Sequence, residues 1–320
     1  MNRTPRLARS LLLATATATA AVVALAPPAF AAAPMVKTQA PGYFRLMLGQ
    51  FEVTALSDGT VDLPVDQLLK EPADTTRKAM AAHFLAVPTE TSVNAFLVNT
   101  GTKLVLVDTG AGALFGPTLG RLVASLKAAG YEPGQVDDVL VTHMHPDHVG
   151  GLVAAGQVVF PNATLHLGQA DVDALMKAAP PADGKPAEPG PRDMVAPYAA
   201  AKHLQPVVAD GEIVPGIRAE AAHGHTPGHT VYVVESGGRK LLLVGDLIHV
   251  GAVQFAHPEV TISFDSDTKA AAAARAKVFH EAAKEGAWVG AAHLQFPGIG
   301  HLKANGAGWD WLPVNWTQNR

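Results

Sequence analysis

The sequence predicts an α/β fold in which sheets and helices form layers. Apolar, strand-like runs alternate with segments of helical spacing in both halves of the chain, and this alternation is typical of layered α/β proteins. Hydrophobic residues make up 48% of the 320 residues, which is ample for a buried core. The length allows one large domain or two small ones, and no precise repeat divides the sequence.

The first half of the chain contains short apolar runs bounded by Gly, Asp and Asn turns. Five of these runs are expected to form strands: residues 44–48, 51–56, 95–99, 104–108 and 139–142. Residues 57–59 have the composition of a turn after the second run. Residues 114–129 have leucines at helical spacing, so a helix is expected there, ending at Gly130.

The second half of the chain also contains strand-like and helical segments, which are expected to form a hairpin and a long helix. Residues 231–235 and 240–245 are expected to pair around a Ser-Gly-Gly turn. The Ala-rich residues 268–284 predict a helix. Residues 178–201 contain six prolines and are not expected to form regular structure. This Pro-rich stretch is either a surface excursion or a loop that borders a substrate cleft.

Residues 1–31 have the features of a secretory signal peptide. Its parts are a positively charged start at residues 3–9, an apolar run at residues 11–25 and an A-x-A cleavage site at residues 29–31. The apolar run is shorter than the roughly 20 residues of a spanning helix, which disfavours a membrane anchor. Cleavage after residue 31 leaves 289 of the 320 residues. A periplasmic or secreted protein is therefore expected, beginning with a flexible tail at residues 32–41.

The composition excludes several classes of site and partner. The chain has no Cys, so it has no disulfide, thiolate metal site or cysteine nucleophile. Its 14 His residues, with Asp and Glu, are then the available zinc ligands. The net charge of −4 becomes −7 when the three arginines of the signal peptide are removed, which disfavours a nucleic-acid partner.

A cluster of metal-binding residue types follows the strand expected at residues 139–142. His143, His145, Asp147 and His148 fall within six residues. An extended segment points the first two imidazoles in the same direction, and the following proline redirects the chain so that Asp147 and His148 face a second ion. Imidazole and carboxylate suit a divalent ion when thiolates are absent. The spacing therefore predicts a metal site.

The order of the later motifs resembles the metallo-β-lactamase superfamily. H-x-H-x-D-H is followed by T-P-G-H ending at His229, by Gly-Asp at Asp246 and by a late His at His293. The likeness spans roughly residues 44–301. It implies an αβ/βα sandwich, in which two packed mixed sheets are flanked by helices and the metals lie at one edge. It also implies a single hydrolase domain at residues 42–320.

The resemblance implies seven ligands for two divalent ions. One ion corresponds to His143, His145 and His229, the other corresponds to Asp147, His148 and His293, and Asp246 bridges them. Asp108 matches an acid that supports the His loop, and a turn-forming Asp is the equal alternative. His225 is a less favoured alternative to His229, and His301 is a less favoured alternative to His293. Zinc is the favoured metal, with cobalt, manganese and iron as alternatives.

The chemistry implied by the resemblance is hydrolysis by a bridging hydroxide. Two ions that share a water lower its pKa, and one of them polarises the oxygen of the substrate. Asp147 and Asp246 are the expected catalytic carboxylates: Asp246 bridges the ions, and Asp147 takes or hands on a proton. A metal-binding module without catalysis is a remote alternative, because the ligand set is complete.

Segments outside the ligands resemble the exported methyl parathion hydrolase group, which includes phosphotriesterases and hydrolases of lactones and aryl esters such as dihydrocoumarin. These segments are residues 40–45, 55–60, 90–93, 114–121, 223–229 and 296–301. The implied substrate pocket contains Phe115, Leu175, His249, Ile262 and Phe264. Leu175 stands where the phosphotriesterases are expected to have a bulkier aromatic ring, and the last three residues resemble the lactonases.

These departures favour a lactone or aryl ester as the main substrate, either dihydrocoumarin-like or an acyl-homoserine lactone. A planar carbonyl fits a narrower slot than the tetrahedral centre of a phosphotriester. A methyl parathion-type phosphotriesterase is the alternative. The expected partner is therefore a small molecule, without a membrane partner after signal cleavage. The resemblance also suggests a homodimer.

Overall fold

The computed structural model describes residues 33–177, 189–208 and 210–318. The chain divides into two units, Met1–Gln39 and Ala40–Arg320, and the second unit carries the fold described below. The signal peptide predicted at residues 1–31 lies outside the described residues, as do residues 178–188 of the Pro-rich stretch. Residues 33–41 are exposed and form no helix or strand. None of the described helices is long and apolar enough to cross a membrane.

Seven strands form the first sheet, in the order β1-β2-β3-β4-β5-β8-β9. They are β1 (Tyr43–Leu48), β2 (Phe51–Leu63), β3 (Thr89–Asn99), β4 (Leu104–Val107), β5 (Asp138–Val141), β8 (Thr164–Gly168) and β9 (Leu204–Val207). β1 to β4 pair antiparallel, whereas β4, β5, β8 and β9 pair parallel, so the sheet is mixed. The five strands predicted in the first half are confirmed, and β2 and β3 are longer than expected.

Seven further strands form the second sheet, in chain order from β10 to β16. They are β10 (Gly211–Val214), β11 (Ile217–Ala221), β12 (Thr230–Ser236), β13 (Arg239–Leu243), β14 (Trp288–Gly290), β15 (Ile299–Asn305) and β16 (Gly308–Pro313). Only β13 and β14 pair parallel among these neighbours. The predicted hairpin is confirmed as β12 and β13. Gly237 and Gly238 turn the chain with φ values of 57° and 74°, which glycine adopts without strain.

The described residues also form eight α-helices and a small two-stranded sheet. The helices are α1 (Val65–Leu68), α2 (Ala73–Ala82), α3 (Leu122–Ala128), α4 (Pro146–Val149), α5 (Gln169–Lys177), α6 (Pro191–Ala200), α7 (Gly251–Gln254) and α8 (Thr268–Glu285). The small sheet pairs β6 (Val153–Ala154) with β7 (Gln157–Val158), and short 3₁₀ turns lie at Pro133–Gln135, Gly150–Leu152 and Gly245–Leu247.

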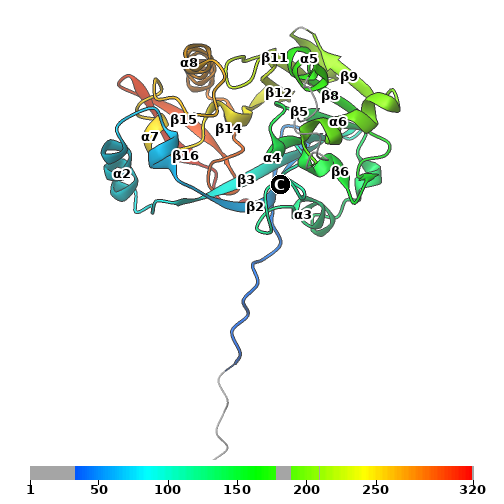
Figure 1. The fold of residues 1–320 in the computed structure, drawn as a ribbon, viewed down its shortest axis with the longest axis horizontal. Helices are drawn as coiled ribbons and strands as arrows, with labels where there is room; N and C mark the ends of the chain where they lie inside the picture. Colours follow the sequence, from blue (N-terminus) through cyan, green and yellow to red (C-terminus); the bar gives the residue numbers. More distant parts are fainter. Residues whose placement is uncertain (1–32, 178–188, 209, 319–320) are drawn as a thin grey trace, which may run out of the picture. The chain divides into compact units, whose positions relative to one another are not determined.

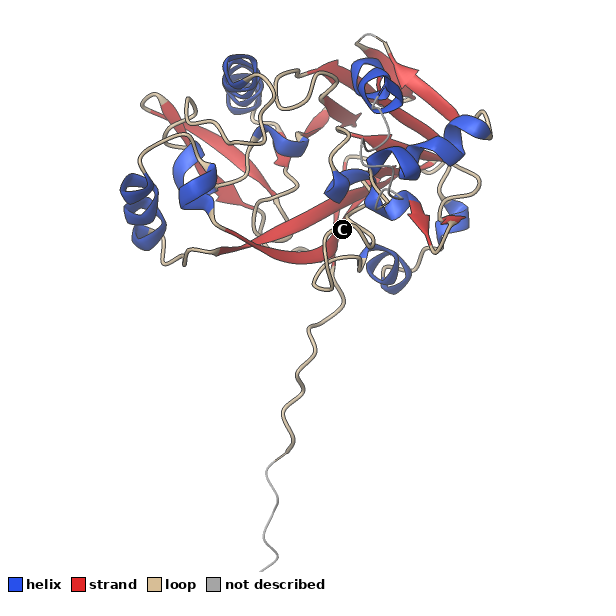
Figure 2. Cartoon of the chain, viewed as in Figure 1, coloured by secondary structure: helices blue, strands red, loops and turns tan. Residues whose placement is uncertain are grey.

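The core occupies both faces of each sheet. Side chains of both sheets, among them Phe96 and Tyr232, share one cluster between the sheets. Helices α3, α5 and α6 pack on the outer face of the first sheet, and α8 packs on the outer face of the second. The order of layers is helix, sheet, sheet, helix (Figures 1 and 2). This arrangement confirms the αβ/βα sandwich.

The Ala-rich helix predicted at residues 268–284 is confirmed as α8. Asp267 caps its N-terminus by accepting a hydrogen bond from the backbone N–H of Ala270 at 3.0 Å. Gly286 ends it in the left-handed conformation, with φ of 65°. Val278 and Phe279 are buried on the face that packs against the second sheet.

The helix predicted at residues 114–129 forms only in its second half, as α3. Gly116 and Gly120 have φ values of 85° and 81°, and Pro117 lies between them, so the backbone cannot continue as a helix there. Residues 111–121 form a loop instead, called the Phe115 loop below. The leucine spacing correctly indicated a buried side chain, because Leu119 is buried. It did not predict the conformation of the backbone.

The expectation of irregular structure is wrong for residues 191–200 of the Pro-rich stretch, which form α6. Pro191 is the first residue of the helix, where its missing N–H costs no intrahelical hydrogen bond. Met194, Val195 and Tyr198 are buried on one face and pack into the outer core. Burial of this face outweighs the unfavourable Pro197 in the helix interior.

Candidate metal centre

The chain topology brings the predicted ligands to one edge of the sandwich. Residues 143–148 follow the carboxyl end of β5, Asp246 follows β13, and His293 follows β14. β13 and β14 run parallel, whereas β12 runs antiparallel to β13, so residues 222–229 before β12 reach the same edge. Side chains that are far apart in the sequence therefore meet.

Four donor groups converge at a first position. They are His143, His145, His225 and Asp246, and their ligand atoms all lie within 4.8 Å of one another. Nδ1 of His145 lies 3.0 Å from Nε2 of His143 and 3.0 Å from Nε2 of His225. Oδ2 of Asp246 lies 3.5 Å from Nε2 of His143 and 3.2 Å from Nε2 of His225. Three imidazoles and a carboxylate are a donor set that suits zinc.

A second group of donors lies on the other side of Asp246. Asp147, His148 and His293 have ligand atoms within 4.8 Å of one another. Nε2 of His293 lies 3.4 Å from Oδ2 of Asp147. Oδ1 of Asp246 lies 3.1 Å from Nε2 of both His148 and His293. The two oxygens of Asp246 therefore face different groups, as a bridging carboxylate requires.

Buried polar atoms in these groups fit metal ions. Nε2 of His148 and Oδ1 of Asp246 are buried and make no hydrogen bond. Since buried polar atoms in folded proteins nearly always have partners, these two mark a place for a cation. The two clusters of His and Asp donors, in a chain without thiolates, fit a pair of divalent metal ions.

Asp108 has the contacts expected of an acid that supports the His loop. It follows β4, and its Oδ2 accepts a hydrogen bond from Nδ1–H of His148 at 2.9 Å. Oδ1 accepts a hydrogen bond from the backbone N–H of Thr142 at 2.8 Å. With Nδ1 engaged in this way, Nε2 of His148 is left as the nitrogen that can bind a metal.

Two buried carboxylates that the sequence analysis did not single out hold the His-bearing loops. Oδ1 of Asp265 lies 2.8 Å from Nδ1 of His225. Asp171, in the first turn of α5, accepts hydrogen bonds from the backbone N–H groups of Met144 at 3.0 Å and Gly228 at 2.7 Å. Asp171 thereby joins the two loops. No local motif marks either acid, because each acts on residues distant in the sequence.

The structure does not bring His229 into either group of donors. Its Nε2 accepts a hydrogen bond from the backbone N–H of Asp246 at 3.2 Å. The turn between the two imidazoles directs His225 toward His145 and Asp246 instead. His301 also lies away from the donors, with Nδ1 at 3.0 Å from the carbonyl oxygen of Ala287. The geometry therefore favours His225 over His229 as the third imidazole.

Burial and neighbouring charges set the protonation of the site. Burial lowers the pKa of His145 to about 4 and that of His249 to about 4. Burial also disfavours charged His225, but its hydrogen bonds with Asp246 and Asp265 outweigh this effect and raise its pKa to about 9. Burial alone would raise the pKa of Asp246, yet the surrounding imidazoles hold it well below the usual value. A divalent cation would displace the proton from His225 on binding.

A pocket of about 180 Å³ opens onto the donor groups. Its lining includes three of the five predicted substrate-pocket residues, Phe115, His249 and Phe264. Val61 and Leu63, at the end of β2, add to its apolar wall. Oδ2 of Asp246 lies 3.1 Å from Nε2 of His249, which lines the pocket beside the donors and forms a further group of possible ligands with Asp246 and His293.

The other two predicted pocket residues lie in cores. Leu175 is buried among the side chains of α5, α6 and the first sheet. Ile262 is fully buried in a smaller cluster with Val65 and Met80. Both were assigned to the pocket by resemblance to the methyl parathion hydrolase group, and such a resemblance does not fix the direction of a side chain. The structure therefore corrects these two assignments.

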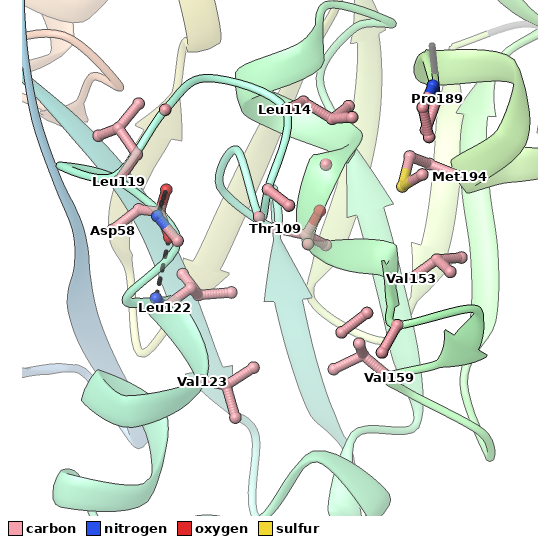
Figure 3. A pocket seen from close by; sticks show the side chains of 18 of the residues that line it. Asp58, Thr109, Leu114, Leu119, Leu122, Val123, Val153, Val159, Pro189 and Met194 are labelled. Carbon is pink, nitrogen blue, oxygen red and sulfur yellow. Dashed lines mark hydrogen bonds between the residues drawn. The ribbon is translucent and has the colours of Figure 1, made fainter. Parts of the chain in front are cut away.

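A larger cavity lies elsewhere. It measures about 1060 Å³ and is bounded by the Phe115 loop, by residues 150–156 and by Met194 of α6 (Figure 3). Asp58 is its one charged lining residue in the described part of the chain, and its carboxylate is occupied by backbone N–H groups. The chemistry of the lining, rather than the volume, identifies the smaller pocket as the candidate site.

The family model of the Metallo-beta-lactamase superfamily matches residues 88–293, which include both donor groups. This chain belongs to the metallo-beta-lactamase superfamily. It is a hydrolase of that superfamily, and the resemblance seen in the sequence is confirmed. The match begins in the loop before β3 and ends at His293, so it spans the strands that carry the metal-binding edge.

Solved structures of superfamily hydrolases are similar along nearly the whole chain. The hydrolase AbOPH of the beta lactamase superfamily is 35% identical, with a TM-score of 0.81, over 88% of this chain and 100% of that chain. AidC, a dizinc quorum-quenching lactonase in complex with a product, is 28% identical, with a TM-score of 0.78, over 87% of this chain and 99% of that chain.

A curated relative is similar over a shorter segment. An N-acyl homoserine lactonase from Bacillus sp is 29% identical over 116 residues, which is 36% of this chain and 40% of the relative. A second, from Bacillus cereus, is 27% identical over 39% of this chain and 43% of the relative. The chain thus matches less than half the length of these curated relatives.

Proposed function

We propose that this protein is a hydrolase of lactones and aryl esters that uses two divalent metal ions. The observation that carries the proposal is the shared carboxylate of Asp246, whose two oxygens face separate donor groups at the bottom of one pocket. The structural similarity to a dizinc lactonase and the local similarity to N-acyl homoserine lactonases support the carbonyl substrate.

Seven side chains would hold the ions. They are His143, His145 and His225 at one position, Asp147, His148 and His293 at the other, and Asp246 between them. Zinc suits this set of imidazoles and carboxylates, and a zinc pair is named for the similar lactonase. When bound, the ions would supply an activated water and polarise the carbonyl oxygen of the substrate.

The chain's own carboxylates differ in their access to water. The side chain of Asp147 is 16% exposed, whereas that of Asp246 is 3% exposed. Asp147 also lines the pocket, so it can accept a proton from the attacking water and pass it to the leaving oxygen. Asp246, which is enclosed by imidazoles, remains ionised and keeps the two donor groups together.

The pocket wall favours a planar substrate with an apolar substituent. Phe115 and Phe264 are both partly exposed and border the same space as the donors. A volume of about 180 Å³ suits a small substrate such as a fused ring or a lactone with a short acyl chain. His249 offers a polar edge next to the carbonyl position.

The test is a panel of substrates with enzyme loaded with zinc, cobalt or manganese. We expect hydrolysis of dihydrocoumarin, short N-acyl homoserine lactones and phenyl acetate, abolished by a chelator and restored by metal. Comparison of kcat/KM across these compounds and methyl paraoxon orders the substrate classes. Rapid turnover of methyl paraoxon with no activity on lactones or esters would contradict the proposal and favour a phosphotriesterase.

Two further predictions from the sequence remain part of this proposal. Removal of residues 1–31 and export to the periplasm or medium would be seen as a mature N-terminus at residue 32 in the exported protein. A homodimer would be seen as twice the chain mass in light scattering. Neither property is needed for the assignment of the metal ligands.

A further inference from the structure

Asp58 is a buried carboxylate that the proposed reaction does not use. It lies in β2, within the segment Ser57-Asp58-Gly59 that the sequence analysis interpreted as a turn. The strand continues through it, with a shift of register between Ser57 and Gly59 where β2 pairs with β3. This irregularity of the β2–β3 pairing lies at the place where Asp58 meets the Phe115 loop.

The carboxylate of Asp58 binds both ends of the Phe115 loop. Oδ2 accepts hydrogen bonds from the backbone N–H groups of Ala111 at 2.9 Å and Gly120 at 3.0 Å. Oδ1 accepts one from the N–H of Leu122 at 2.9 Å. The backbone carbonyl of Asp58 accepts a fourth, from the N–H of Arg121 at 3.0 Å. Hydrogen bonds to an ionised acceptor are stronger than those between neutral groups.

The two ends of the loop approach so closely that only glycine fits. A Cβ atom on Gly120 would lie 2.4 Å from the carbonyl oxygen of Gly112, and a Cβ atom on Gly110 would lie 2.4 Å from Cγ of Asp58. All three glycines have positive φ values. The residues between the closed ends form a compact surface loop, whose shape depends on that closure.

The Phe115 loop separates the metal pocket from the large cavity. Phe115 lines the metal pocket, whereas Leu114 and Leu119 line the cavity of about 1060 Å³ on the other side (Figure 3). Leu119 packs with Val93 and Ala111, and the hydrogen bonds of Asp58 hold the two ends of the loop.

We propose that Asp58 is a positioning residue for substrate selection, which holds the Phe115 loop closed so that Phe115 forms the wall of the metal pocket. The expected kinetic effect rests on the proposed function. The closure of the loop by Asp58, called the clamp below, does not depend on that function. Since the backbone groups around the carboxylate are donors, an amide at this position would turn one acceptor into a donor and release part of the loop.

Hydrogen exchange tests the clamp without any substrate. In Asp58→Asn, amides of residues 111–122 should exchange about tenfold faster than in the wild-type protein, while those of residues 138–149 keep their rates. Asp62→Asn is the matched control, because Asp62 is exposed on the same strand. Unchanged exchange in the loop, or an equal loss in both segments, would overturn the proposal.

Kinetics with metal-loaded enzyme test the consequence for substrates. We expect Asp58→Asn to raise KM for phenyl acetate and dihydrocoumarin about tenfold, with kcat within about twofold and metal content unchanged. Phe115→Ala should have the same effect, and the double variant should be no worse than Phe115→Ala alone. The proposal would be overturned if the KM increases of the two single variants multiplied in the double variant. It would also be overturned if kcat and metal content fell together.

A second variant covers the case in which Asp58→Asn does not fold. Gly120→Ala disturbs the same closure without changing the carboxylate, and it should show the same exchange and KM effects. Normal loop exchange and a normal KM in a folded Gly120→Ala protein would contradict the clamp. If the wild-type enzyme hydrolyses no lactone or ester, the proposed function fails, and the exchange experiment still decides the role of Asp58.

Discussion

Two hollows border the Phe115 loop, and they differ in volume and in the chemistry of their lining. The smaller measures about 180 Å³ and is lined by His145, Asp147, Asp246, His249 and His293. The larger measures about 1060 Å³ and is lined mainly by glycine and apolar side chains. Convergent donors with unsatisfied atoms, rather than volume, distinguish the candidate metal site from the larger cavity.

The difference follows from where each hollow lies in the fold. The metal pocket forms where the loops after β5, β13 and β14 meet the loop before β12. Asp108 and Asp171 bind the loop after β5, and Asp265 binds His225 in the loop before β12. The large cavity lies below a glycine-rich loop on the outer side of the first sheet. Substitutions in the two hollows should therefore have different effects.

Asp246→Ala should cause the largest loss, because both donor groups share this carboxylate. Hydrolysis should fall by at least about 100-fold, since even residues that only support metal ligands contribute 10–100-fold. Elemental analysis after gel filtration should show one ion or none in place of two. Normal metal content and rate would remove Asp246 from the shared position.

The next largest effect should separate His225 from His229. His225→Ala should lose one of two ions and about 100-fold in rate, because its Nε2 faces His145 and Asp246. His229→Ala should keep both ions, because its Nε2 binds the backbone of Asp246. Metal content of the two purified variants is the measurement. The opposite pattern would restore the assignment made from the sequence.

Asp171→Asn should have an intermediate effect, on metal affinity. Asp171 is buried and joins the loops of Met144 and Gly228. Weakening these hydrogen bonds should reduce the affinity for metal about 10–100-fold. Competition with a coloured chelator gives the affinity. Asp173→Asn, at an exposed position on the same helix, is the control and should behave as wild type. Equal affinities in both variants would show that the loops do not depend on Asp171.

Met194→Ala should have the smallest effect on activity. Met194 is buried and borders the large cavity, so its truncation should cost about 2 kcal/mol of folding free energy. Tm should fall by roughly 4–8 °C in a thermal scan. The kcat and KM for lactones should stay unchanged. A changed KM would show that the large cavity communicates with the metal pocket and would weaken the comparison.

The fold class and most of the candidate metal site could be predicted from the sequence alone. His143, His145, Asp147 and His148 lie in six consecutive residues after a strand, so local geometry already brings them together. Asp246 could also be identified, because a carboxylate directly after a buried strand must lie at the edge of its sheet. These features depend on short stretches of chain, in which spacing fixes direction.

Features that depend on contacts between distant parts of the chain could be assigned only from the folded structure. The turn between His225 and His229 leaves either imidazole free to face the ions, and its orientation follows from Asp171 and Asp265 on other elements. The Phe115 loop lies where a helix was predicted, because Gly116 and Gly120 have positive φ values, and Asp58 on β2 binds the two ends of the loop. Spacing along a chain fixes the direction of a side chain only within regular structure, and in irregular loops distant partners fix it.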